Sequence, residues 1–262
     1  MNKTLKKKYL KLIDYLKNKN IIVSYSGGKD SLLLSILSSR YSNYSLSIMV
    51  NNGFISKDNI KMAEKYSKEY DFNIKIINYN FLKNDIIFKI NENLNKKCYY
   101  CKKCMGNIIL KESKKLKDKL KLKDVVIVDG TNCDDIKEDR LGLKAYKKLK
   151  IISPYLLFDI DGEDVKNILK YLNVDIPQSD SCLATRILNP PIIKDRLKRI
   201  ERSEKLVRNN LNIKGYFRLR DYDNLCIFDI NEDEINKFFN IDKGLIEVLK
   251  KSGFKKCLLD LK

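Results

Sequence analysis

The octapeptide SYSGGKDS, residues 24–31, follows an apolar run and has the residue types of a phosphate-binding loop. Glycine N–H groups can approach an anion closely, serine hydroxyls add donors, and the start of a following helix adds the positive end of its dipole. The loop is not a Walker A sequence, because Asp30 stands where that motif has its hydroxyl. A carboxylate repels phosphate unless a cation lies between them, so Asp30 predicts Mg²⁺ and a nucleotide cleaved to pyrophosphate. The predicted ATP-binding residues of this loop are Ser24, Ser26, Gly27, Gly28, Lys29, Asp30 and Ser31.

A second polar cluster, DGTNCDD, covers residues 129–135 and also follows an apolar run. Together with Asn51, which ends an earlier run, it adds candidate nucleotide ligands: Asn51, Asp129, Thr131 and Asn132. The acidic residues farther along the chain, near Arg140, are Asp134, Asp135 and Asp139. Taken alone, this acidic segment is equally compatible with a solvated turn.

The third candidate site is KKCYYCKKCMG, in which Cys98, Cys101 and Cys104 form a C-x-x-C-x-x-C pattern. The chain has seven cysteines and no histidine, so any metal must be held by thiolate or carboxylate groups. Zinc would need a fourth ligand, and iron–sulfur ligation by thiolates is equally compatible. The spacing does not decide between the two. We expect Cys133, Cys226 and Cys257 to be small buried side chains.

The elements that must position these residues form an alternating pattern. Short apolar runs at 21–25, 46–50, 74–78 and 125–129 predict buried parallel strands, and helix-period segments occupy 30–40, 56–70 and about 104–120. The alternation predicts an α/β fold with a doubly wound, mostly parallel sheet. In such sheets ligands bind beyond the carboxyl ends of the strands, where the polar segments above must lie. Asp161 and Gly162 are expected to start a further helix.

The pattern changes after residue 180. A charged helix at 194–210 is followed by two strands around a turn at 221–224, short helices at 231–239 and 243–252, and a last strand in KKCLLDL. We therefore predict an ATP-binding domain at 1–180 and a small α+β domain at 181–262 that binds substrate or forms an oligomer. We also expect the protein to be a homo-oligomer.

Composition excludes some classes of partner. No apolar run approaches the roughly 18 residues that span a membrane, and the N-terminal segment has no signal-peptide character, so we expect a cytoplasmic protein. The net charge is +19. Its basic residues are spread along the chain without a basic tail or arm, which indicates a solvated basic surface and does not favour a nucleic-acid partner.

The loop SGGKDS resembles the signature of the PP-loop ATP pyrophosphatases, which adenylate a carbonyl or carboxylate oxygen and release pyrophosphate. Together with DGTNCDD, SCLATRI and the ending GYFRLRDYDNLCIFDI, it resembles LarE, the sulfur transferase family of nickel-pincer cofactor synthesis. The resemblance runs from about residue 18 to 261, with the blocks in the family's order.

This resemblance implies an adenylating sulfurtransferase. A carboxylate of pyridinium-3,5-biscarboxylic acid mononucleotide attacks the α-phosphate of ATP, and sulfur then displaces AMP to leave a thiocarboxylate. Asp30 carries over as the catalytic magnesium ligand. The residues matched to the substrate-phosphate site are Arg186, Arg218, Arg220 and Glu204. An exposed strand edge is the structural alternative for Arg218 and Arg220.

The resemblance also implies the sulfur source. One LarE class uses a single cysteine at the position of Cys182, and another adds a C-x-x-C and binds a [4Fe–4S] cluster. This chain is similar to the cluster class, with Cys98, Cys101 and Cys182 as metal ligands and Cys182 as a catalytic residue. An external sulfide or other sulfur donor is the implied partner. Cys104 stays open as a replacement for Cys98 or Cys101.

Three alternatives stay open. The first is a cluster-dependent PP-loop tRNA thiolase. The basic charge of the chain fits this function, but we find no appended RNA-binding module in the sequence. A non-catalytic scaffold holding zinc or iron–sulfur through the cysteines is the second. The third is single-use chemistry, in which Cys182 gives up its own sulfur and becomes dehydroalanine.

Overall fold

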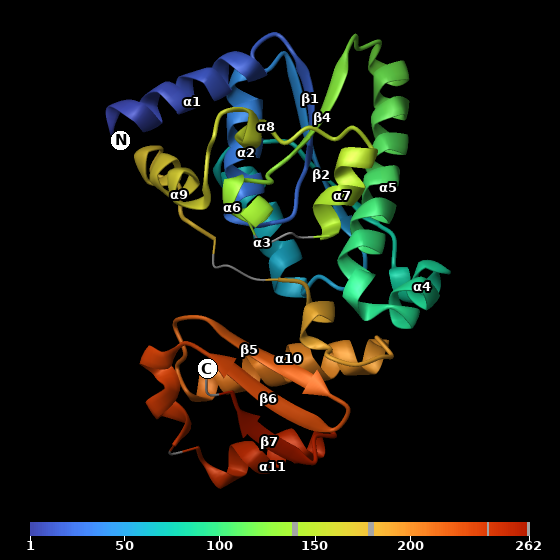
Figure 1. Cartoon of the computed structure of the whole chain (residues 1–262), viewed down its shortest axis with the longest axis vertical. Helices are drawn as coiled ribbons and strands as arrows, with labels where there is room; N and C mark the ends of the chain where they lie inside the picture. The colour runs from blue at the N-terminus through green and yellow to red at the C-terminus, as the bar shows by residue number, and fades with distance from the viewer. Residues whose placement is uncertain (138–140, 178–180, 240, 261–262) are drawn as a thin grey trace. The chain divides into compact units, whose positions relative to one another are not determined.

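Figure 1 shows a computed structural model of the chain, which describes residues 1–137, 141–177, 181–239 and 241–260. The chain folds into two compact units. Unit 1 comprises Met1–Gly53, Lys57–Asn80 and Asn95–Asp180, and unit 2 comprises Phe54–Ser56, Phe81–Leu94 and Ser181–Lys262. The expected division into 1–180 and 181–262 therefore differs from the observed one, because two short segments from the first half of the chain belong to unit 2.

Unit 1 is built on a four-stranded sheet in the order β3–β2–β1–β4, and every neighbouring pair is parallel. Its strands are β1 (Asn20–Ser24), β2 (Tyr44–Asn51), β3 (Ile74–Asn78) and β4 (Val125–Asp129). The predicted strands agree with these bounds to within two residues. The chain runs outward from β1 to β3 and then returns to place β4 on the other side of β1, so the strand order reverses between β1 and β4.

The sheet is buried because helices cover both of its faces. Helix α2 (Lys29–Tyr41) packs on β1 and β2 and contacts α1 (Lys3–Leu16) and α9 (Gly162–Tyr171) on its outer side. Helix α5 (Lys97–Leu120) packs on β1, β2 and β4 from the opposite face together with α7 (Leu141–Lys148), so the sheet lies between two helical layers (Figure 1). This is the doubly wound α/β arrangement that the sequence predicts for unit 1.

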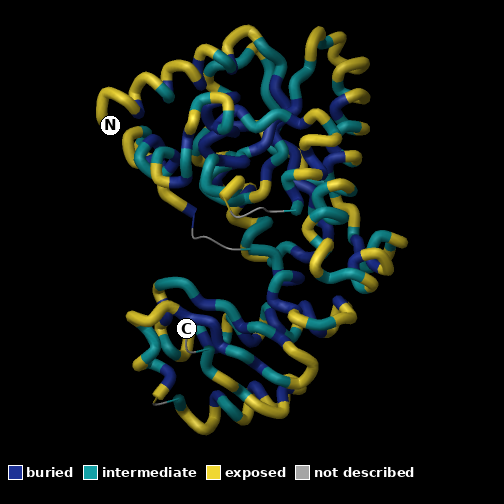
Figure 2. Tube along the Cα trace, in the orientation of Figure 1, coloured by how far each residue is buried: buried dark blue, intermediate teal, exposed yellow. Residues whose placement is uncertain are grey.

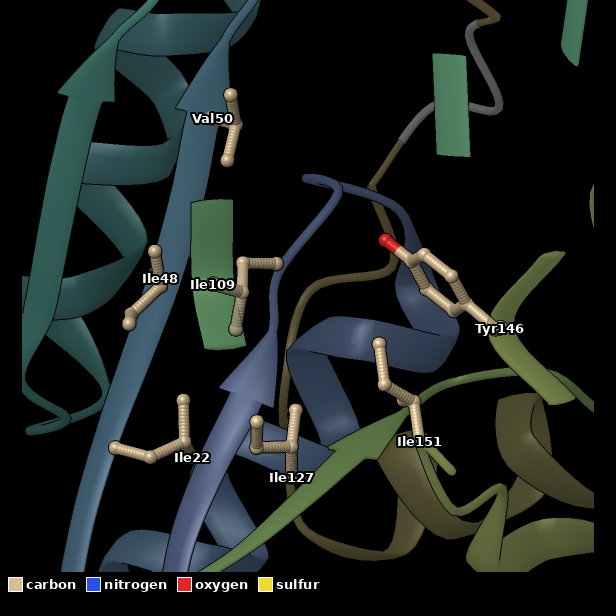
Figure 3. Packing of buried hydrophobic residues seen from close by; sticks show 7 residues of the cluster. All are labelled: Ile22, Ile48, Val50, Ile109, Ile127, Tyr146 and Ile151. Atoms are coloured by element: carbon tan, nitrogen blue, oxygen red, sulfur yellow. The ribbon is translucent and has the colours of Figure 1, made fainter. Parts of the chain in front are cut away.

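Helix α2 lies between the sheet and other helices, which explains its composition. Its run LLLSIL is buried all round, as expected for a helix with no face toward solvent, and Figure 2 shows β1 and α2 buried along most of their length. On the opposite face, Ile109 of α5 and Tyr146 of α7 pack against β-branched residues of the sheet (Figure 3). Branched side chains of this kind suit the buried faces of parallel strands.

Two features of unit 1 bear directly on the predictions. Helix α5 begins at Lys97 and not near residue 104, so all three cysteines of the C-x-x-C-x-x-C pattern are helical. Helix α9 begins as predicted, because the Asp161 side chain accepts hydrogen bonds from the Glu163 and Asp164 N–H groups in a capping box. The remaining helices of the unit are α3 (Lys57–Glu69), α6 (Cys133–Lys137) and α8 (Pro154–Leu157).

Unit 2 contains a three-stranded sheet in the order β5–β6–β7. The pair β5 (Phe217–Tyr222) and β6 (Leu225–Ile230) is antiparallel, whereas β6 and β7 (Lys256–Leu259) are parallel. Helix α10 (Lys194–Asn210) packs against β5, and α11 (Lys243–Lys251) contacts α10. Helix α4 (Ile86–Glu92) and the 3₁₀ helices Phe81–Lys83, Leu183–Arg186 and Glu232–Phe238 complete this unit.

Alternation along the strands of unit 2 gives the sheet two different faces. Phe217 and Leu219 of β5 lie with Phe228 of β6 on the buried face, where Phe217, Phe228 and Phe238 form an aromatic cluster. The intervening residues of β5 are half-buried and present arginines on the other face. Over the residues that the structure describes, no helix has the length and apolar character needed to span a membrane.

Candidate functional site

The loop between β1 and α2 has the backbone of an anion site. Gly27 has φ of +87°, a conformation that residues with a Cβ rarely adopt. Gly28 is the N-cap of α2 and, having no side chain, leaves the N–H groups at the positive end of the helix uncovered. Both glycines therefore shape the backbone at the start of α2.

Two serines hold the loop in this shape. The hydroxyls of Ser26 and Ser31 lie 3.1 Å apart, and Ser31 donates to the Gly28 carbonyl oxygen at 3.0 Å. The Ser26 N–H also donates to Ser31 Oγ at 3.2 Å. These bonds join the two ends of the loop, so its N–H groups are held in place before any ligand arrives.

Asp30 lies in the first turn of α2 and meets side chains from two parts of unit 1. The Lys29 ammonium lies 2.7 Å from Asp30 Oδ1, and Asn132 donates Nδ2 to the same oxygen at 2.9 Å. Asn132 follows β4, so this hydrogen bond joins the loops after β1 and β4, where the strand order reverses. Open parallel sheets bind ligands at such a switch point.

Close backbone approach brings the two loops together. A Cβ added to Gly130 would lie 2.7 Å from the Ser31 nitrogen and 2.9 Å from the Asp30 carbonyl carbon, so only glycine fits there without moving the backbone. Tyr155 fastens the same turn from the other side, because its hydroxyl donates to the Asp30 carbonyl oxygen at 2.8 Å. Burial raises the pKa of Tyr155 well above its usual value, so this phenol stays a donor.

Asp129, at the end of β4, is a buried anchor for neighbouring side chains. It accepts hydrogen bonds from Thr131 and Ser153, each at 2.5 Å, and the Lys102 ammonium lies 3.9 Å away. Asp129 and Thr131 are therefore bound to each other. At the end of β2, Asn51 similarly donates to Asn78 at 2.9 Å, so its amide fastens the neighbouring strand end.

The acidic segment after Asn132 contacts the start of another helix. Asp134 Oδ2 accepts the Gly162 N–H at 3.0 Å, and a Cβ at Gly162 would come within 3.2 Å of Lys29 Nζ. The Gly162 N–H, followed by Lys137, lowers the pKa of Asp134. The N-terminus of α9 thus borders the same loops. Asp139 and Arg140 of the predicted acidic cluster lie outside the described residues.

The cysteine pair of α5 lies one helical turn apart. Cys98 is exposed and Cys101 is half-buried, and residues three apart share a helix face. Asn52, which follows β2, donates Nδ2 to Cys101 Sγ at 3.3 Å, so this thiol lies at the end of the sheet that carries the loops. Burial raises the pKa of Cys104, which favours its neutral thiol over a thiolate ligand.

Helix α5 is tied to the end of β1 through the residue next to Cys101. The Lys102 ammonium lies 4.8 Å from the centre of the Tyr146 ring, and the Tyr146 hydroxyl lies 2.9 Å from Ser24 Oγ. Figure 3 shows Tyr146 as one of the residues of the buried cluster. Ser24, predicted as a nucleotide ligand, is thereby part of the packing between α7 and β1.

A donor set for a metal is incomplete within either unit. Taken over the described residues of each unit, no three cysteine, aspartate or glutamate side chains converge to hold a metal ion. Cys98 and Cys101 lie together on α5 in unit 1, and Cys182 belongs to unit 2.

In unit 2, the arginine predicted to bind substrate phosphate is buried in its own loop. Arg186 is 1% exposed; its Nε donates to Glu204 Oε1 at 2.9 Å, and its Nη1 donates to the Cys182 carbonyl oxygen at 3.0 Å. Nη1 also contacts both oxygens of Ser181. Glu204 in turn accepts the Leu219 N–H at 3.0 Å, which fastens the Cys182 loop beside β5.

The other two predicted phosphate ligands share the half-buried face of β5. The Arg218 guanidinium lies 4.7 Å from the centre of the Tyr216 ring. Arg220 pairs with Asp229 of β6 at 2.5 Å, and Tyr216 donates its hydroxyl to the same carboxylate at 2.8 Å. The two arginines therefore differ: Arg220 neutralises a fully buried carboxylate, whereas Arg218 rests on an aromatic ring.

The expectation of buried cysteines holds for one of three. Cys226 is fully buried, but Cys133 and Cys257 are only half-buried, which corrects the prediction. Cys133 is the first residue of α6, and Cys257 lies on the edge strand β7, and both positions leave one side open to solvent.

Five residues that contribute to this site were not predicted from the sequence. They are Asn52, Lys102, Gly130, Tyr146 and Tyr155. Gly130 had a usable signal, because a glycine directly after a strand marks a close backbone approach. The others act through partners 27 to 125 residues away along the chain, which no local pattern specifies.

Fold and site together define a parallel α/β protein with a glycine–serine loop at the switch point of its sheet. The chain matches no protein-family model. It is 40% identical over 260 residues to the uncharacterized protein MJ0830 of Methanocaldococcus jannaschii, which covers 97% of this chain and 96% of the relative. It is also 24% identical over 249 residues to the uncharacterized protein slr1717 of Synechocystis, covering 92% and 88%. The chain therefore belongs to the family of MJ0830.

Proposed function

We propose that the protein is an ATP-dependent sulfurtransferase of the LarE type, within the PP-loop ATP pyrophosphatases. It adenylates a carboxylate of pyridinium-3,5-biscarboxylic acid mononucleotide and converts it to a thiocarboxylate, releasing AMP and pyrophosphate. The observation that carries the proposal is the contact between Asp30 and Asn132 beside the uncovered N-terminus of α2. It supports a site for a metal-bound polyphosphate at the switch point of the sheet.

The residues of the loop have different roles in binding and cleaving ATP. The N–H groups around Gly27 and Gly28 and the positive end of α2 stabilise the charge that develops on the leaving pyrophosphate. Serine hydroxyls supply further donors. The Lys29 ammonium, which neutralises Asp30 in the free protein, turns to the phosphates when the nucleotide binds.

Asp30 fits a magnesium ligand. Mg²⁺ is held in proteins by one or two carboxylates together with substrate phosphates, and Asp30 is a carboxylate at the helix start where those phosphates would lie. Bound magnesium supplies charge neutralisation between Asp30 and the phosphate oxygens. Asn132 holds the carboxylate in position, because its side-chain amide donates a hydrogen bond to Asp30 Oδ1.

Acid activation needs no histidine in this scheme. A substrate carboxylate is already ionised at neutral pH, so its oxygen attacks the α-phosphorus directly, the bond to pyrophosphate breaks, and an acyl-adenylate forms. Sulfur then attacks the acyl carbon and AMP leaves. The chain has no histidine, so a reaction that requires no general base for the attack suits its composition.

Unit 2 supplies candidate contacts for the substrate's phosphate group. Arg218, stacked on Tyr216, has a planar guanidinium that suits a phosphate dianion. Arg186 and Arg220 are paired with Glu204 and Asp229 in the free protein, so they contact the substrate's phosphate only if they exchange these carboxylate partners for it.

Cysteine chemistry supports the sulfur-transfer half of the proposal. Cys98 and Cys101, one helical turn apart, fit two thiolate ligands of a [4Fe–4S] cluster. The third ligand, Cys182, follows from the resemblance alone. Such a cluster would supply the iron chemistry for the transfer of sulfur. In the free protein, the Asn52 amide orients the Cys101 sulfur.

The adenylation half is tested by product analysis. Protein reconstituted anaerobically with iron and sulfide is incubated with Mg²⁺, ATP and the pyridinium diacid mononucleotide, and pyrophosphate and orthophosphate are measured separately. We expect pyrophosphate release that Asp30→Asn lowers about 100-fold or more. Asp58→Asn, which changes the first-turn aspartate of α3, is the matched control and should retain the rate. Release of orthophosphate, or no dependence on the acid, refutes the proposal.

The sulfur-transfer half is tested by the fate of iron and of Cys182. We expect bound iron and labile sulfide in the reconstituted protein, their loss in Cys98→Ala, and no thiocarboxylate product in Cys182→Ala. Zinc without iron would favour the scaffold alternative. Loss of about one H₂S from the protein mass after turnover would favour sacrificial Cys182, and salt-sensitive tRNA binding with tRNA thiolation would favour the tRNA thiolase.

A further inference from the structure

Two cysteines of unit 2 face each other across neighbouring strands. Cys226 of β6 and Cys257 of β7 are direct partners in the parallel register of the two strands. Cys226 is fully buried, whereas Cys257 is half-buried on the edge strand of the sheet. One thiol of the pair can therefore meet a reagent from solution, and the second lies directly behind it.

The distance between such strands permits a covalent link. Neighbouring strands lie about 4.8 Å apart. Disulfides join residues whose Cα atoms are about 4.4–6.8 Å apart. In-register residues point to the same face, so both sulfur atoms lie on one side of the sheet. Strand β7 has four residues and a single neighbouring strand, so it can adjust without breaking a second ladder.

An ion-paired cluster lies beside Cys226. Asp221 of β5 is the register partner of Cys226 on its other side, and it is bound by Arg196 at 2.7 Å and Arg199 at 2.5 Å. Arg199 also donates to the Gly253 carbonyl oxygen at 3.1 Å, in the segment that leads into β7. One carboxylate thus faces two guanidinium groups beside the thiols.

The half-buried thiol of Cys257 is more acidic than the buried thiol of Cys226, as thiol–disulfide exchange starting at Cys257 requires. The hydrogen bond from Cys226 lowers the pKa of Cys257, and Lys250 acts in the same direction. Burial raises the pKa of Cys226, so its proton stays available for that hydrogen bond. The half-buried sulfur is thereby the better nucleophile, and the buried sulfur is the one that attacks second.

We propose that Cys226 and Cys257 form a redox-active dithiol that is converted to a disulfide by low-molecular-weight disulfides. The Cys257 thiolate attacks one sulfur of the small disulfide, that S–S bond breaks, and a thiolate leaves with its electron pair. Cys226 then gives up its proton and attacks the Cys257 sulfur of the mixed disulfide, which expels the second small thiolate. Two protein thiols and one disulfide give one protein disulfide and two small thiols, with two electrons transferred to the reagent.

The site is independent of the proposed sulfurtransferase reaction. It uses neither the cysteines of α5 nor Cys182, and its chemistry needs no ATP or metal. Formation of the disulfide links the short edge strand β7 covalently to β6. It therefore makes the C-terminal strand of unit 2 resistant to local opening under oxidising conditions.

The test is peptide mapping of the full chain equilibrated with reduced and oxidised glutathione at a series of ratios. Free thiols are alkylated under denaturing conditions at each ratio, and the protein is digested without reduction. We expect a peptide pair linked through Cys226 and Cys257 that grows with the proportion of oxidised glutathione and disappears after reduction. Recovery of both cysteines fully alkylated at every ratio would overturn the inference.

Variants assign the order of attack. Cys226→Ser should accumulate a stable glutathione adduct on Cys257, whereas Cys257→Ser should leave Cys226 unmodified because it is buried. Cys133→Ser, which removes a half-buried thiol of unit 1, is the matched control and should retain the linked peptide. If Cys226→Ser does not fold, Cys226→Ala serves the same purpose. Absence of an adduct on Cys257 in a folded Cys226 variant contradicts the proposal.

Discussion

Asn132 donates its Nδ2 hydrogen to Asp30 Oδ1 at 2.9 Å, between residues 102 positions apart in the chain. Asn132 follows β4, and Asp30 lies in the first turn of α2, which follows β1. The bond therefore joins the two loops at the point where the strand order of the sheet reverses. Its donor is neutral and its acceptor is charged, and bonds of this kind are stronger than those between neutral groups. The position of the Asp30 carboxylate therefore depends on a residue from the far half of unit 1.

Replacing Asn132 with serine isolates this bond. Asn132 Oδ1 also accepts the Asp134 N–H at 2.9 Å at the start of α6, and serine can keep that cap but is too short to reach Asp30. We expect magnesium–ATP affinity to fall about 10-fold, because a hydrogen bond to a charged group contributes about 1.5–3 kcal/mol. Isothermal titration measures the affinity. Asn107→Ser, on the exposed side of α5, is the control, and equal affinities for Asn132→Ser and wild type would contradict the expectation.

Gly130 tests whether close backbone approach sets the site. In Gly130→Ala the added Cβ would meet backbone atoms of Asp30 and Ser31 at 2.7–2.9 Å, so the start of α2 must move. We expect both a lower melting temperature and lower nucleotide affinity. Gly28→Ala is the matched comparison, because its Cβ would find its nearest neighbour at 3.6 Å. That variant should keep wild-type stability and lose affinity, and a loss of stability in Gly28→Ala but not in Gly130→Ala would reverse this interpretation.

Substitutions of Arg218 and Arg220 should have different effects, the first on substrate binding and the second on stability. Arg220→Ala leaves the fully buried Asp229 with the Tyr216 hydroxyl in place of its ion pair, and we expect it to lower the free energy of unfolding by about 1–3 kcal/mol. Arg218→Ala removes a guanidinium that rests on a ring, so stability should change little while KM for the phosphorylated substrate rises. Chemical denaturation and steady-state kinetics measure the two effects. The same stability loss in both variants would show that the arginines are equivalent.

Glu234 makes a pH-dependent contribution to the stability of unit 2. It accepts hydrogen bonds from Lys237 Nζ at 2.7 Å and from the Lys214 and Gly215 N–H groups at 2.9 and 2.8 Å, which lower its pKa from 4.5 to about 2. Because the folded state holds this group ionised, its contribution is complete above about pH 4.5 and is lost as pH falls toward 2.

The corresponding variant is Glu234→Gln. We expect wild type to be more stable than this variant at pH 6, and the difference to shrink as pH is lowered from about 4.5 to about 2. Thermal unfolding followed by circular dichroism at several pH values measures it. Glu247→Gln, on the exposed side of α11, is the control. A stability difference that does not change with pH would mean that Glu234 acts through packing and not through charge.

Local signals predicted the elements of unit 1 well. The strands at 74–78 and 125–129 have the predicted bounds, and α9 begins at the predicted aspartate cap. These features depend on residues within one or two turns of each other: a buried apolar run, a glycine, or an N-cap side chain. The predicted start of α5, near residue 104, was wrong, because KKCYYCKKC has no helical periodicity of apolar residues. This part of the helix is stabilised instead by packing against α7.

What the sequence determined by itself is the parallel α/β layout of unit 1 and the loop with Ser26, Gly27, Gly28 and Asp30, since each follows from neighbours along the chain. Only the tertiary structure decided which groups meet there. Strand order brings Asn132 to Asp30, and the packing of α5 and α7 brings Lys102 to Asp129 and Tyr146 to Ser24. Short sequence patterns record backbone preference and burial. Pairings between residues about 30 to 120 positions apart depend instead on how the strands are ordered and how the helices pack upon them.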